Sequence, residues 1–120
     1  MLTRILTVDD EPKWLAFTQA NLDAGFEVET ASDLATTLAK LKSSPYDLII
    51  ASSRQLDILK AISADYPDRR VVVATGQPTT QEAIKTYRLG ALDYFPKDFR
   101  PEVISAKIRE ALQKPLKTPA

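Results

Sequence analysis

Five short apolar runs, each followed by a segment with helical periodicity, constrain the fold of this chain more than any other feature of its sequence. The runs are rich in β-branched residues and occupy residues 5–8, 26–30, 47–52, 71–75 and 92–95. Strands that alternate with helices through short connections favour a parallel sheet covered on both faces, because right-handed crossovers place the helices there. In such an open sheet the working site is expected at the carboxyl ends of the strands.

The segments between these runs carry the start and stop signals of helices. Pro12 suits a first helical turn, whereas Ser32 or Asp33 can act as an N-cap. The expected helices run from Pro12 through Leu22 with Gly25 as the stop, from Ser32 or Asp33 past Leu41, from Leu56 to Ala64, from Thr79 or Thr80 to Gly90, and from Pro101 to Leu112. The pattern therefore predicts five strands and five helices.

The length of 120 residues suits one compact domain. We expect residues 1–112 to form it and residues 113–120 to be a tail or linker, because this segment is rich in Lys and Pro and lacks apolar periodicity. Sixteen basic residues balance sixteen acidic ones, which argues against a nucleic-acid-binding face. No apolar run reaches the length of a membrane span, and Asp9 and Asp10 interrupt the N-terminal apolar stretch. A cytoplasmic domain with no membrane contact is expected.

The absence of Cys and His excludes thiolate sites, imidazole ligands and imidazole bases. Polar residues nevertheless gather where the strands end: Asp9 and Asp10 follow the first strand, Ser52 ends the third, Thr75 ends the fourth, and Lys97 follows the fifth. Because the carboxyl ends of parallel strands share one edge of the sheet, these side chains are predicted to converge on one pocket.

The segments that carry this layout are "ILTVDDEP", "YDLIIAS", "VVVATG" and "GALDYFPKDF". In this order and spacing, the sequence resembles the response-regulator receiver domains of two-component signalling over about residues 2–112. The resemblance implies an α/β, flavodoxin-like, doubly wound (βα)5 sandwich with a five-stranded parallel sheet in the order 2-1-3-4-5.

In that family an acidic pair holds magnesium, and an aspartate at the end of the third strand accepts a phosphoryl group. The resemblance therefore implies that Asp9 and Asp10 are metal-side acids, that Thr75 is the switch hydroxyl and that Lys97 is the cation. Tyr94 matches the aromatic residue that rotates in the output switch.

The sequence departs from this pattern at the phosphoacceptor itself, where Ser52 replaces the aspartate. A serine hydroxyl is a poor nucleophile without a base, and this chain has no His to serve as one. Residues 53–57 also form a shorter loop than the family's. We therefore expect no enzymatic activity, no required cofactor and at most weak magnesium binding. The predicted function is a pseudo-receiver, a signalling module that acts through protein contacts; the alternative is a working phosphorelay receiver that uses Asp57.

Several residues have a plain structural interpretation beside the functional one. Asp9 and Asp10 suit a capped acidic turn as well as a vestigial metal site, and Thr75 can simply satisfy a backbone group after its strand. Lys97 is expected to pair with one of the two acids. Because Asp98 follows it where the family has proline, the Lys97–Asp98 bond should be trans and the ammonium displaced from the pocket.

The resemblance also implies a partner face. In this family the fourth helix, fifth strand and fifth helix form the contact surface, which here comprises residues 80–90, 92–95 and 101–113. Arg88 and Lys107 supply charge on it, and Tyr94 is either a half-buried packing residue or an aromatic anchor. A protein partner or self-association through this face is expected.

Overall fold

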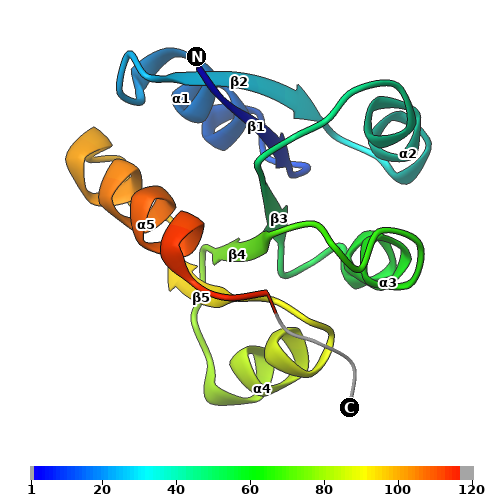
Figure 1. Cartoon of the computed structure of the whole chain (residues 1–120). Helices are drawn as coiled ribbons and strands as arrows, with labels where there is room; N and C mark the ends of the chain where they lie inside the picture. The colour runs from blue at the N-terminus through cyan, green and yellow to red at the C-terminus, as the bar shows by residue number, and fades with distance from the viewer. Residues whose placement is uncertain (1, 117–120) are drawn as a thin grey trace.

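In the computed structural model, which describes residues 2–116, strands and helices alternate along the chain (Figure 1). The elements are β1 (Thr3–Val8), α1 (Pro12–Asn21), β2 (Phe26–Ala31), α2 (Leu34–Ser43), β3 (Leu48–Ser52), α3 (Leu56–Asp65), β4 (Val71–Thr75), α4 (Thr80–Arg88), β5 (Asp93–Pro96) and α5 (Pro101–Gln113). All of the expected strands and helices are present. No helix in residues 2–116 is long and apolar enough to cross a membrane.

The strands form one parallel sheet in the order β2-β1-β3-β4-β5, as the sequence predicts. Figure 1 shows α1 and α5 on one side of the sheet and α2 and α3 on the other, with α4 beside β5. Every residue of β3 and β4 is buried, because helices cover both faces of these central strands.

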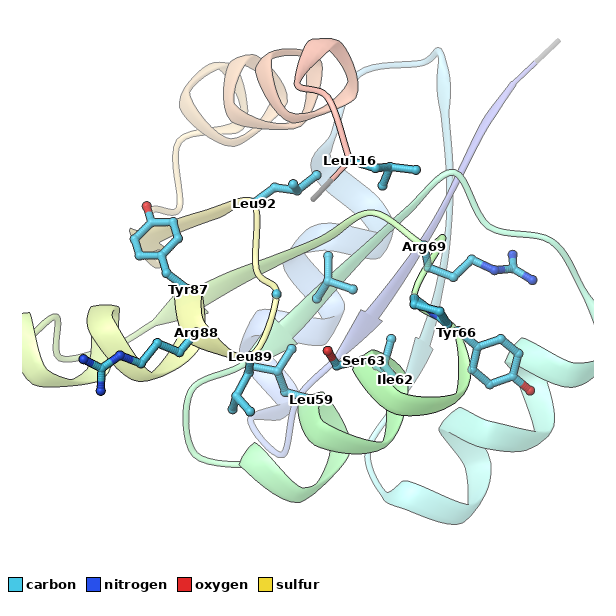
Figure 2. Close-up of a pocket in the computed structure, with 13 residues that line it drawn as sticks. Leu59, Ile62, Ser63, Tyr66, Arg69, Tyr87, Arg88, Leu89, Leu92 and Leu116 are labelled. Carbon is cyan, nitrogen blue, oxygen red and sulfur yellow. The ribbon is translucent and has the colours of Figure 1, made fainter. Parts of the chain in front are cut away.

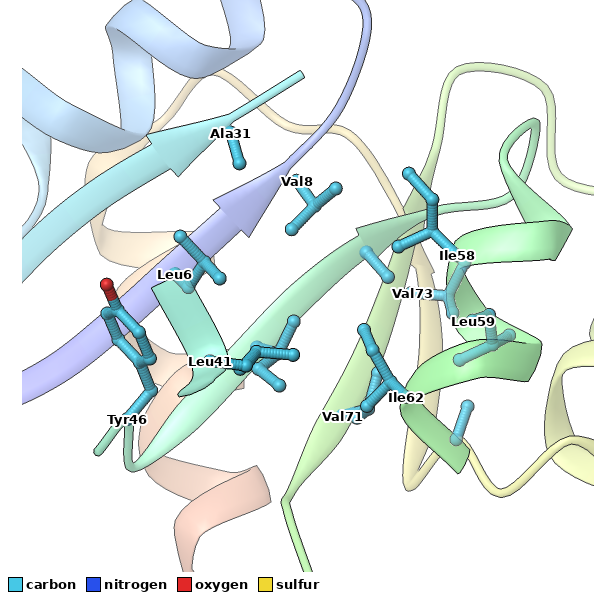
Figure 3. Close-up of a cluster of buried hydrophobic side chains, with 13 residues drawn as sticks. Leu6, Val8, Ala31, Leu41, Tyr46, Ile58, Leu59, Ile62, Val71 and Val73 are labelled. Atoms are coloured by element: carbon cyan, nitrogen blue, oxygen red, sulfur yellow. The ribbon is translucent and has the colours of Figure 1, made fainter. Parts of the chain in front are cut away.

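Side chains alternate across the sheet and build a separate core on each face. Leu6 and Val73 point toward α2 and α3, where they pack with Leu41 and Ile62 (Figure 3), and Ile49 belongs to the same core. The opposite core contains Ile5, Leu48, Ile50, Val72, Ala74, Trp14, Phe17, Ile104 and Ile108. Both cores hold the strands rigidly, and this rigidity fixes the positions of the residues at their carboxyl ends.

Some element ends differ from the prediction. Helix α1 ends at Asn21, because Leu22 is already extended, with φ −78° and ψ 168°. Strand β3 begins at Leu48, and the preceding Asp47 instead accepts a hydrogen bond from Arg4 N through its carboxylate at 2.8 Å. Helix α5 ends at Gln113, one residue past the predicted domain boundary at residue 112. Of the predicted tail, residues 117–120 lie outside the described part of the chain.

Candidate functional site

The predicted polar residues meet at the carboxyl edge of the sheet. A cavity of about 290 Å³ lies there, and its lining includes Ser52, Thr75 and Lys97. Asp9, directly after β1, reaches the same place through its contact with Lys97. The structure therefore brings together residues from the ends of β1, β3, β4 and β5, as the spacing in the sequence predicts.

Asp9 and Lys97 form a buried ion pair. Lys97 Nζ lies 3.0 Å from Asp9 Oδ2, and the two side chains are 6% and 0% exposed. The same ammonium lies 3.4 Å from Glu11 Oε2, and Asp9 Oδ1 accepts a hydrogen bond from Glu11 N at 3.0 Å. Burial raises the pKa of Asp9, although Lys97 works in the opposite direction.

The expectation that Lys97 is displaced from the pocket is therefore wrong. The structure has no cis peptide bond in residues 2–116, so the prediction of a trans Lys97–Asp98 bond is confirmed. The lysine is positioned in another way: its backbone N–H donates to Thr75 O at 2.7 Å, which continues the pairing of β5 with β4. Sheet pairing thus aims the side chain into the site without a special turn.

Asp10 is paired with a different cation, Arg54. Arg54 Nη2 donates to Asp10 Oδ1 in a short charge-assisted hydrogen bond. Desolvation favours protonation of Asp10, but the hydrogen bond and charge of Arg54 outweigh it and lower the pKa of this carboxyl. The sequence reasoning missed Arg54; its place two residues after Ser52 at a strand end was the available signal.

These ion pairs decide whether the residues present fit magnesium. Magnesium is held by carboxylates that face a common point, with water and phosphate completing an octahedron. Here the Asp9 carboxylate is directed to Lys97 and the Asp10 carboxylate to Arg54, and no group of three acidic side chains in residues 2–116 is arranged to hold a metal ion. This donor set does not fit the ion.

Ser52 is 2% exposed, and its Oγ accepts a hydrogen bond from Arg54 N at 3.1 Å. This bond is typical of a polar side chain that satisfies the first amide of a turn. Within residues 2–116, no carboxylate accepts a hydrogen bond from the Ser52 hydroxyl, so no group is placed to act as its base. Asp57 lies in the first turn of α3 and is exposed to solvent.

Glu82 also belongs to this site, although the sequence analysis did not single it out. Its Oε1 accepts hydrogen bonds from Thr75 Oγ1 at 3.1 Å and from Tyr94 Oη at 2.6 Å. Thr75 Oγ1 in turn accepts from Ser53 Oγ at 3.1 Å and from Gln77 N at 3.2 Å. Thr75 thus satisfies the backbone of the following turn, as one interpretation predicts, and also contacts Tyr94 indirectly through the carboxylate.

The three elements expected to carry the partner face, α4, β5 and α5, are present, and exposed apolar residues lie on α4. Tyr94 is half-buried and its hydroxyl points to Glu82, whereas Ile84 and Tyr87 on α4 are 45% and 39% exposed. Arg88 is exposed beside them, and Lys107 lies on α5 with its Nζ 3.9 Å from Asp93 Oδ2.

A second cavity, of about 320 Å³, lies between α3 and α4; its lining includes Arg88 of the expected partner face but none of Asp9, Ser52, Thr75 and Lys97 (Figure 2). Leu59, Ile62 and Leu89 form apolar walls, and Leu116, from the segment after α5, lies against it. That segment is anchored, because Lys114 Nζ donates to Leu92 O at 3.1 Å and Arg70 Nη2 donates to Lys114 O at 3.1 Å. Residues 114–116 are therefore attached to the domain.

Comparisons with known proteins agree with this architecture. The family model of the response regulator receiver domain matches residues 5–109. The acid tolerance regulatory protein ActR of Rhizobium meliloti (strain 1021) is 35% identical over 99 residues, which are 78% of this chain and 51% of ActR. The chain thus spans about half the length of this relative.

Two solved structures resemble the fold closely. NtrX from Brucella abortus has a TM-score of 0.85 and 28% identity, covering 94% of this chain and 26% of that protein. A response regulator from Thermotoga maritima has a TM-score of 0.86 and 20% identity, covering 95% of this chain and 100% of that protein, a likeness that shows the fold alone. With the family model, the strand order and the position of the polar site in agreement, the chain belongs to the response-regulator receiver domains of two-component systems.

Proposed function

We propose that this domain is a pseudo-receiver, a signalling module that acts through protein contacts without aspartyl phosphorylation. The observation that carries the proposal is Ser52: a buried hydroxyl, bonded to a backbone amide, stands where transfer requires a carboxylate. Asp57 gives no support to the alternative of a phosphorelay receiver, because it is exposed on α3.

The charges around Ser52 support the same conclusion. Each of the two acids already has a cation of its own, since Asp9 pairs with Lys97 and Asp10 with Arg54. A phosphoryl donor would also meet Glu11 and Glu82 at the cavity lining, and their negative charges disfavour its approach. The proposed activity accordingly requires no cofactor and no catalytic step. We also propose that the domain works in the cytoplasm.

For the contact surface we propose the face made by α4, β5 and α5, reached by a protein partner or a second copy. Ile84 and Tyr87 offer exposed apolar surface, and Arg88 and Lys107 offer charge at its edge. An apolar centre with a charged rim is typical of reversible protein interfaces. Tyr94 lies under this surface and connects it to Thr75 through Glu82.

The proposal is tested with acetyl phosphate and magnesium, with intact mass as the readout. The expected result is an unchanged mass over the time in which a phosphorylatable receiver domain, run in parallel as a positive control, is fully modified. A stoichiometric mass increase that hydroxylamine removes would identify an acyl phosphate and overturn the proposal. Mapping such a product to Asp57 or to Asp10 would identify the carboxylate that serves in place of Ser52.

A further inference from the structure

Helix α4 begins with a hydrogen-bond arrangement that departs from the usual one. Thr79 is the N-cap, and its Oγ1 accepts from Glu82 N at 3.1 Å. Threonine at the N-cap with glutamate three residues later is the spacing of a capping box. In that motif the glutamate carboxylate accepts a hydrogen bond directly from the backbone N–H of the N-cap residue.

In this protein the hydroxyl of Tyr94 stands between the two groups. Thr79 N donates to Tyr94 Oη at 3.1 Å, and Tyr94 Oη donates to Glu82 Oε1 at 2.6 Å. A residue of β5 therefore completes the cap of α4. Burial and the hydrogen bond to Glu82 raise the pKa of Tyr94, which keeps its proton in this bridge.

The bridge extends to the strand-end site. Thr75 Oγ1 donates its single proton to Glu82 Oε1 at 3.1 Å, while accepting from Ser53 Oγ and Gln77 N. A hydroxyl has only one proton to donate. The protons of Thr75 and Tyr94 are therefore both directed to one carboxylate oxygen.

We propose that Glu82 is a two-position switch that couples the start of α4 to Tyr94 and Thr75. We call the arrangement in the structure the open box: the Glu82 carboxylate accepts from Tyr94 Oη and holds the Tyr94 side chain against the start of α4. In the closed box, Glu82 accepts directly from Thr79 N, and the Tyr94 hydroxyl and the Thr75 proton are both released. The backbone N–H of Thr79 has an acceptor in both arrangements, Tyr94 Oη in the open box and Glu82 in the closed box. Exchange between the two therefore leaves this amide paired at both ends.

The consequence for signalling rests on the proposed function, because a partner must read the face that contains Tyr94. Tyr94 on β5 contacts Glu82 on α4, the helix that also carries the exposed Ile84. Movement of the Tyr94 ring away from Glu82 changes the surface between β5 and α4. A partner that prefers one arrangement would shift the domain toward it by its difference in affinity for the two.

The test compares amide hydrogen exchange at Thr79 in four proteins: the wild type, Tyr94→Phe, Glu82→Ala and the double variant. Glu110→Ala, an exposed glutamate on α5, is the matched control. We expect the Thr79 amide of Tyr94→Phe to stay as protected as in the wild type, because Glu82 closes on it. The double variant has neither acceptor, so the same amide should exchange roughly fivefold faster or more.

If Tyr94→Phe alone exposes the Thr79 amide as much as the double variant does, the box does not close and the switch is wrong. Side-chain couplings give a second readout that needs no double variant. Tyr94 should occupy one χ1 rotamer in the wild type and Glu110→Ala, and several in Glu82→Ala; a single rotamer in all three would also overturn the switch. Neither experiment uses a phosphodonor, so failure of the proposed function and failure of the switch give separate results.

Discussion

Lys97 and Asp9 form the central contact of the site: their charged atoms lie 3.0 Å apart, and both side chains are almost wholly buried. Removing one member of such a pair leaves the other charge without a partner in a poorly hydrated place. We predict that Lys97→Met lowers the free energy of unfolding by about 3–5 kcal/mol, measured by urea denaturation. The double variant Asp9→Asn/Lys97→Met should recover much of this loss; a double variant as unstable as the single one would contradict the pairing.

The pairs around Ser52 predict the behaviour of a restored carboxylate. In Ser52→Asp a third acid enters a buried place beside Asp9, so we expect a stability loss of about 1–3 kcal/mol. We also expect no phosphoryl transfer from acetyl phosphate with magnesium, because Arg54 and Lys97 still hold the two acids. Ser52→Asn, which adds similar volume without charge, is the control for stability. Full phosphorylation of Ser52→Asp, with no modification of Ser52→Asn, would show that the Asp9–Lys97 and Asp10–Arg54 pairs do not prevent metal binding and transfer.

Gly90 provides a test of backbone strain. Its φ is +104°, and a Cβ there would lie 3.2 Å from Ser63 Oγ on α3. We predict that Gly90→Ala costs about 1–2 kcal/mol of stability, since the strain of alanine at this φ exceeds the stabilisation from the lower entropy of its unfolded chain. Gly25→Ala is the matched control, because its Cβ would meet nothing within 4 Å and its φ is not positive. Equal melting temperatures for the two variants would refute the strain.

Tyr46 predicts a change of stability at alkaline pH. Its hydroxyl donates to Glu29 Oε1 at 3.1 Å, and burial together with this hydrogen bond raises its pKa to about 12, from 10.0 in the unfolded chain. The folded state therefore keeps a proton that the unfolded state loses. The stabilising contribution is full below pH 10 and is lost as the pH rises through about 12.

Spectrophotometric titration of the tyrosinate absorbance measures this pKa, with Tyr46→Phe to assign the transition. Glu29→Gln should lower the pKa of Tyr46, because the negative charge that opposes ionisation is removed. A titration of Tyr46 at its ordinary value in the wild type would show that the contact with Glu29 does not persist in solution.

The proposed partner face predicts a separation of binding from stability. Arg88 is exposed, and Lys107 is half-exposed, with its Nζ 3.9 Å from Asp93 Oδ2 and 5.9 Å from the centroid of the Phe95 ring. Charge reversal at both positions should weaken self-association or partner capture, measured by sedimentation or titration, and leave the melting temperature nearly unchanged. Lys13→Glu is the control, as Lys13 is exposed on α1, outside the proposed face. Loss of association in the control alone would place the interface on α1.

The sequence predicted most of the fold because its signals are local and mutually consistent. The β-branched runs that became β3 and β4 are bounded by turn residues, and burial on both faces leaves them no other arrangement. The meeting of Asp9, Ser52, Thr75 and Lys97 follows from parallel strands alone. Element ends were less certain, as with α1, because several residues near Leu22 can end a helix.

Contacts between long side chains from different loops were not predictable in the same way. Arg54 and Asp10 are 44 positions apart in the sequence, and no periodic pattern predicts their contact. Glu82 carried a recognisable capping-box spacing with Thr79, but the spacing gives no sign that Tyr94 enters the box. The prediction that Lys97 is displaced rested on the turn at Lys97–Asp98. It did not take into account that the backbone N–H of Lys97 pairs with Thr75 O and so continues the sheet.

The separate pairing of each acid with its own cation has an evolutionary consequence. A lineage that lost only the phosphoacceptor could regain it by one substitution, since the rest of the site would still await metal and phosphate. Here Arg54 would have to leave Asp10 and Lys97 would have to loosen its hold on Asp9 as well. Each intermediate step leaves an acid without its partner, so selection for stability opposes the return. On the proposed function, these two ion pairs would make the loss of phosphate chemistry hard to reverse.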